Sequence, residues 1–197
     1  MSSLSLFRVD ANNPDFARMD EMIVSLRTLL TEKPNPNNKL WMSNICKVID
    51  FQDDDGSFRL LDSYEVPADA RVDYCYIPSY LCSAILMKVY MAPVKSIHNE
   101  METALIKSLR FCTGRRFYGH GYDGFMGQME AIDIFREGSL TCFLKRHSHL
   151  CPEFSSLISE VRRDLKRRIR EEDFCGVWGE NNEEDIKRNY AYLSELK

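Results

Sequence analysis

The sequence lacks a long uninterrupted apolar run and an excess of positive charge. Its most apolar stretch, residues 77–91, contains Pro78, two serines and Lys88, so it is too short and too polar to cross a bilayer, and we expect no membrane anchor. The 26 Lys and Arg residues are outnumbered by 30 Asp and Glu residues, which gives a formal net charge of -4. This balance argues against a protein that binds nucleic acid through its overall charge.

Signatures of several common functional classes are also missing. We recognise no signal peptide, no P-loop, no glycine-rich dinucleotide fingerprint and no GxSxG nucleophile elbow. The 7 cysteines are odd in number and scattered singly, which fits a reducing compartment better than a disulfide scaffold. We therefore expect a cytoplasmic protein.

What the sequence does have is helical periodicity along almost its whole length, with no convincing strand pattern. Of the 197 residues, 44% are hydrophobic, which is enough for the core of one domain. The predicted helices cover residues 14–32, 40–51, 76–91, 96–114, 125–136, 140–147, 152–169 and 182–193. The third is apolar on nearly every side and should be the central core helix. We predict an all-α fold in which residues 1–197 form one domain of stacked helical hairpins.

A weak internal repeat is visible in this helical chain. The tripeptide Ser-Leu-Arg at residues 25–27 recurs at residues 108–110, and the helices that follow can be aligned at a similar offset. We therefore predict a repeat of residues 14–92 and 96–175, as expected for duplicated hairpins. Chance similarity between amphipathic helices is the alternative.

The three aspartates at residues 53–55, followed by Gly56, form the first candidate site, because carboxylates near a glycine can bind a hard cation. An EF-hand is excluded: with Gly56 in the sixth position of its loop, Phe51, which has no oxygen ligand, would occupy the first. An acidic solvated turn is the simpler interpretation.

Two further segments suit the binding of an anion. Arg71 lies between Asp69 and Asp73 before the apolar helix, where it either forms a structural ion pair or holds the oxygens of a phosphate or carboxylate. His120 lies in a glycine-rich loop, residues 114–124, that leads into a predicted helix N-terminus, where free amide groups favour an anion. A structural histidine is the alternative.

Two weaker patterns lie toward the C-terminus. Residues 162–170 contain six Lys and Arg residues around Asp164, and two glutamates follow, so we interpret this segment as a solvated basic helix face. His147 and His149 lie close to Cys151, but their spacing matches no standard structural zinc pattern.

Three segments resemble, in the same order, motifs of the α/α-toroid superfamily, which contains terpenoid cyclases and the β subunits of protein prenyltransferases. Residues 52–58, QDDDGSF, resemble its Q-x-x-D-G-S-W/F turn. Residues 69–75, DARVDYC, are similar to the D-x-R-x-x-Y-C segment of the prenyltransferase subunits, and residues 120–127, HGYDGFMG, resemble their histidine-glycine loop. The resemblance implies a partial α/α toroid, because the chain supplies about half of the helices of a closed ring.

By this resemblance, Arg71 and His120 would face a central cavity that handles an isoprenoid diphosphate and an acceptor peptide. Tyr74 and Tyr122 would be further ligand-binding residues. A homodimer or a second subunit would complete the ring.

The resemblance also implies a zinc ion, which the family holds through an Asp-x-Cys pair and a later histidine to activate the acceptor thiol. Asp173 and Cys175 have the spacing of that pair. No histidine follows them, so the third zinc ligand is missing.

We therefore expect a helical domain that binds an apolar or phosphorylated small molecule, or a peptide, in a concave cavity, and that acts as a prenyl-type transferase if it is catalytic. One alternative is a non-catalytic helical protein-interaction module. Another is a glycan-active toroid, which requires Asp55, Asp73 or Asp123 to form a facing carboxylate pair.

Overall fold

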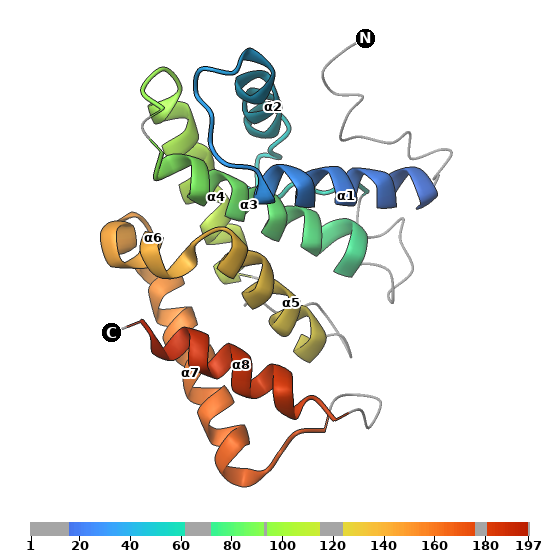
Figure 1. Ribbon diagram of the computed structural model, residues 1–197, viewed down its shortest axis with the longest axis vertical. Coiled ribbons are helices and arrows are strands. Elements are labelled where there is room, and N and C mark those ends of the chain that lie inside the picture. Colours follow the sequence, from blue (N-terminus) through green and yellow to red (C-terminus); the bar gives the residue numbers. More distant parts are fainter. Residues whose placement is uncertain (1–15, 62–71, 93, 115–123, 176–180, 197) are drawn as a thin grey trace.

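The computed structural model describes residues 16–61, 72–92, 94–114, 124–175 and 181–196, which are organised as a helical assembly (Figure 1). The α-helices are α1 (Phe16–Thr31), α2 (Lys39–Asp50), α3 (Ile77–Tyr90), α4 (His98–Gly114), α5 (Gly124–Glu137), α6 (Leu140–His147), α7 (Pro152–Glu171) and α8 (Glu183–Ser194). Within these ranges there is no strand, only an isolated bridge between Cys175 and Asn181. The predicted all-α fold is confirmed. The toroid arrangement and the internal repeat stay predictions.

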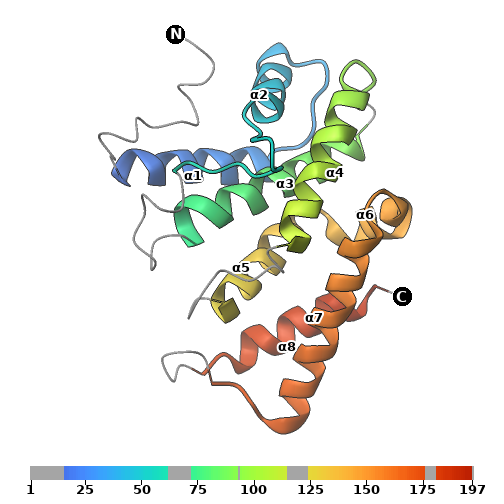
Figure 2. The same ribbon diagram turned by 180° about the vertical axis from the view of Figure 1, so that it is seen from behind.

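Helix α3 is the centre of the core. It packs against α1, α4, α5 and α6 (Figures 1 and 2), and every residue of α3 except Lys88 and Tyr90 is buried. Lys88, its only charged residue, donates from Nζ to the carbonyl oxygens of Leu30 (2.5 Å) and Glu32 (2.6 Å) at the end of α1. The prediction of a central core helix is therefore confirmed, and its one charge is satisfied by free carbonyls of a helix C-terminus.

Helix α2 begins at Lys39, one residue before its predicted start. The side chain of Asn38 accepts hydrogen bonds from the backbone N–H groups of Leu40 (2.9 Å) and Trp41 (3.2 Å), as an N-cap residue does. Trp41, Ile45 and Val48 are the buried face. The cap and the apolar spacing together fix which side of α2 faces the core.

Helices α7 and α8 lie side by side at the end of the molecule away from α1 and α2 (Figures 1 and 2). Helix α7 also contacts α4, and α8 contacts α5. A tight turn, η5 (Ser148–Leu150), joins α6 to α7, and a π-helical turn, η3 (Val72–Tyr76), precedes α3. No helix of the described ranges is long and apolar enough to traverse a membrane.

Candidate functional site

The turn at residues 52–58 docks the end of α2 onto α4. Gln52 Nε2 donates to the carbonyl oxygens of Gly56 (3.2 Å) and Ala104 (2.8 Å), so one amide closes the turn and joins it to α4. Gly56 has a φ of +90° and lies against the backbone of Lys107. Gln52 and Gly56 of this motif thus have packing roles.

The carboxylate of Asp55 has partners inside the same turn. Its Oδ1 accepts from the backbone N–H (3.0 Å) and the hydroxyl (2.6 Å) of Ser57, and its Oδ2 accepts from Arg59 (2.9 Å). Phe58 is fully buried, and its N–H donates to Ser79 Oγ on α3 at 2.9 Å. This geometry is that of an acidic structural turn, as the simpler interpretation of the sequence expects.

Of the four predicted ligand-binding residues, only Tyr74 is described. Arg71, His120 and Tyr122 lie outside the described residues, so their convergence on a cavity stays a prediction. The Tyr74 side chain is 8% exposed, and its hydroxyl donates to Asp20 Oδ1 on α1 at 2.9 Å. Tyr74 therefore links the entry of α3 to α1.

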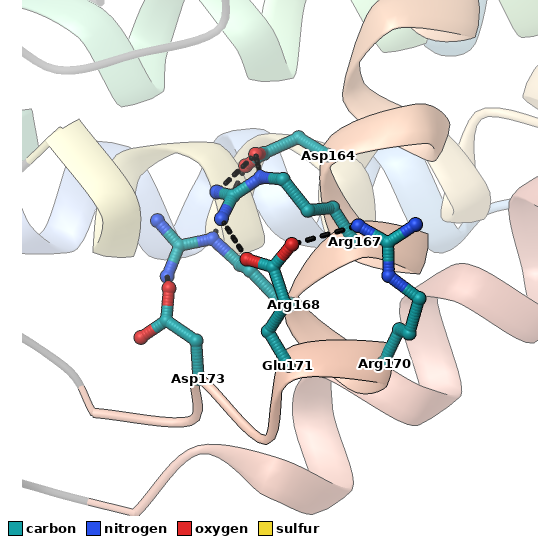
Figure 3. A network of polar contacts seen from close by, with 6 residues as sticks. All are labelled: Asp164, Arg167, Arg168, Arg170, Glu171 and Asp173. Atoms are coloured by element: carbon teal, nitrogen blue, oxygen red, sulfur yellow. Dashed lines mark hydrogen bonds and ion pairs between the residues drawn. The ribbon is translucent and has the colours of Figure 1, made fainter.

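Asp173, the first residue of the predicted zinc pair, belongs to a charged network at the end of α7 (Figure 3), and Cys175 follows it in the chain. Asp173 Oδ2 accepts from Arg168 at 3.3 Å, while Cys175 is exposed. Among the residues whose positions are described, no group of three or more His, Cys, Asp or Glu side chains is placed to hold a metal ion. The zinc site stays a prediction, and the observed partner of Asp173 is an arginine.

Two histidine rings contact Tyr90 at the end of α3, and a third histidine ring lies next to one of them. The His98 ring, at the start of α4, stacks on the Tyr90 ring with centroids 4.9 Å apart. The His147 ring, at the end of α6, meets it edge-on at 5.0 Å, and His149 lies 6.2 Å from His147. The Tyr90 hydroxyl donates to Glu102 Oε2 at 2.6 Å. We call these five residues the Tyr90 cluster.

Burial and neighbouring charge set the protonation of this cluster. Burial, and then the hydrogen bond to Glu102, raise the pKa of Tyr90 to about 12, so its hydroxyl remains a donor at neutral pH. Burial first, and then the positive charges of His149, Arg146 and His98, lower the pKa of His147, while Glu102 opposes this. His147 therefore favours its neutral form in the folded protein.

A surface cavity of about 440 Å³ opens beside this cluster, lined by Tyr90, Ala92, Val94, Lys95, His98 and Asn99. Its wall combines an aromatic ring and aliphatic side chains with an ammonium group and an imidazole. Apolar walls with a few polar groups are the usual composition of a small-molecule site. The described lining residues all lie between residues 90 and 99, where the chain passes from α3 to α4. Only the contact of His147 with Tyr90 depends on the packing of a helix distant in sequence.

The lowered pKa of His147 predicts a loss of stability in mild acid. The unfolded chain takes up a proton near pH 6.5, whereas the folded chain resists it. The contribution of His147 is therefore fully present above that pH and is lost as the pH falls through 6.5 toward the folded pKa. Urea unfolding between about pH 5 and about pH 8 should show a flatter profile for His147→Gln than for the wild type. An unchanged profile would contradict this assignment.

Comparisons of the chain with protein-family models, with curated proteins and with solved structures find no match.

Proposed function

We propose that this chain is a helical binding domain that takes a small molecule with an apolar body and an anionic group in the cavity beside Tyr90. The observation that carries the proposal is a cavity lined by Tyr90, Lys95 and His98. The rings of His98 and His147 pack against the Tyr90 ring beside it.

Each part of the cavity suits one part of such a ligand. The Lys95 ammonium and the His98 ring N–H are donors for an anionic group, because both side chains are exposed enough to reach it. The Tyr90 ring, Ala92 and Val94 offer an apolar surface. The hydrogen bond from the Tyr90 hydroxyl to Glu102 holds the ring in place. The cavity wall is therefore preorganised before a ligand binds.

An isoprenoid diphosphate has both of these parts, which makes farnesyl diphosphate a suitable probe. We propose binding only, because transfer of the prenyl group would depend on Arg71 and His120, which lie outside the described residues.

A glycan-active site is not supported by Asp55, because its carboxylate accepts hydrogen bonds from Ser57 and Arg59.

Calorimetry and thermal shift with farnesyl diphosphate test the proposal. We expect the probe to raise the melting temperature of the wild type, and the double variant Lys95→Gln/His98→Gln to lose about tenfold or more in affinity. Lys39→Gln, which removes an exposed charge from the first turn of α2, is the matched control and should bind as the wild type does. No binding by the wild type, or equal loss in both variants, would favour the protein-interaction module instead.

A further inference from the structure

A second cavity lies between α7 and α8 and is basic. Its volume is about 410 Å³, and it is lined by Ser159, Arg162, Arg163, Lys166, Tyr190 and Ser194. The first four residues occupy positions i, i+3, i+4 and i+7 of α7, and the last two occupy positions i and i+4 of α8. Such spacings place residues on one helix face, so the two helices turn these faces toward a shared groove. We call it the α7–α8 groove.

The remaining basic residues of α7, which do not line the groove, form ion pairs with nearby carboxylates (Figure 3). Arg167 binds Asp164 at 2.7 Å and Glu171 at 2.8 Å, and Arg168 binds Asp164 at 3.1 Å. Arg170 binds Glu171 at 2.7 Å. The single solvated basic face expected from the sequence therefore consists of two groups of residues, and Asp164 and Glu171 pair with the group that does not line the groove.

Positive charge in the groove is not compensated in this way. Arg162 donates to the carbonyl oxygen of Leu196 at 2.6 Å, a neutral partner that fixes the side chain. Arg163 and Lys166 are exposed, and neither has an ion-pair partner within the part of the chain that the structure describes. No Asp or Glu belongs to the described lining. Three cations thus converge in a protein whose formal net charge is -4.

Hydroxyl groups complete the donor set. Ser194 Oγ is buried and lacks a hydrogen-bond partner in the described ranges, and Tyr190 and Ser159 line the same groove. A buried hydroxyl without a partner is unfavourable, so a bound acceptor close to Ser194 would relieve a local penalty.

We propose that the α7–α8 groove binds the phosphate groups of a compact anion such as diphosphate or a phosphorylated small molecule. Guanidinium groups form two-point hydrogen bonds with phosphate oxygens, an ammonium group adds a point charge, and hydroxyls fill the remaining directions. A compact anion fits better than a nucleic acid because the neighbouring cations Arg167, Arg168 and Arg170 are already neutralised, so the basic surface does not extend along α7. This site is separate from the cavity beside Tyr90.

Titration calorimetry with inorganic phosphate, inorganic diphosphate and phosphoserine tests the proposal and distinguishes the sources of the phosphate group. We expect Arg163→Gln/Lys166→Gln to weaken diphosphate binding by about tenfold or more. The matched control, Arg167→Gln/Arg170→Gln, removes the same charge from the same helix and should change the affinity by less than about threefold. Both pairs of side chains are exposed, so the variants should fold, which circular dichroism checks.

Three results would overturn the proposal. One is the absence of wild-type binding to every phosphate probe at millimolar concentration. Another is an equal weakening of diphosphate binding by the two double variants, which would indicate a general effect of charge. If the wild type also bound a DNA duplex more tightly than diphosphate, the groove would be part of a nucleic-acid surface. The third is loss of diphosphate binding in Lys95→Gln/His98→Gln but not in Arg163→Gln/Lys166→Gln, which would assign the anion to the cavity beside Tyr90.

Discussion

Replacement of Gly56 by alanine should lower the free energy of unfolding by about 3 kcal/mol or more. Gly56 has a φ of +90°, a backbone conformation that residues with a Cβ rarely adopt. A Cβ at this position would also stand 2.7 Å from the carbonyl carbon of Lys107 and closer still to its oxygen. Because the neighbour is helix backbone, the turn could accommodate a methyl group only by separating from α4.

Gly114→Ala is the matched control, because a Cβ on Gly114, at the end of α4, would meet no atom within 4 Å. Its free energy of unfolding should stay within about 1 kcal/mol of the wild type. Urea unfolding followed by circular dichroism measures both variants. A similar effect of the two substitutions would contradict the docking of the turn on α4.

The Gly56 turn also bears on the resemblance to α/α toroids. Gln52, Asp55 and Gly56, which carry the first motif, are all used in closing the turn or joining it to α4. A turn of this sequence can therefore be maintained for its geometry alone. The motif supports a shared way of connecting helices more directly than it supports a shared chemistry.

The helices could be predicted from the sequence because their signals are local. Helix α3 shows this: its fourteen residues, IPSYLCSAILMKVY, are almost all apolar or small, and such a segment must be surrounded by other elements. The π-helical turn η3 was not predicted, because a single turn with that hydrogen-bond pattern has no periodic signature. Asn182 opens the last helix as its N-cap residue, as the sequence predicts, and the side chain that accepts from the Glu183 N–H is that of its neighbour Asn181, at 3.0 Å.

The sites were predicted less well because they depend on which helices meet. In the sequence, His147 and His149 can be compared only with zinc-ligand spacings. In the structure, the His147 ring contacts Tyr90 at the end of α3, and Tyr90 in turn stacks on His98 at the start of α4. Nothing in the sequence of α7 distinguishes Arg163, which lines the groove, from Arg167, which is paired with Asp164. That separation comes from the carboxylates on one side and from α8 on the other.

Phe135→Ala should be strongly destabilising, lowering the free energy of unfolding by about 3–5 kcal/mol. Phe135 on α5 is fully buried, and its ring centroid lies 5.4 Å from that of Phe154 on α7 and 6.2 Å from that of Tyr80 on α3. One side chain thus joins the central helix to the α7–α8 end of the molecule. Its removal leaves a cavity that three rigid helices cannot easily fill.

Urea unfolding of Phe135→Ala and Phe135→Leu tests this role. Leucine fills much of the space, so its effect should be smaller, about 1–2 kcal/mol. A double-mutant cycle with Phe154→Leu should give a coupling energy of about 0.5–1.5 kcal/mol, because the two rings meet edge to face at an interplanar angle of 63°. An effect of Phe135→Ala no larger than that of Phe135→Leu would mean that the α5–α7 contact does not hold the two ends of the molecule together.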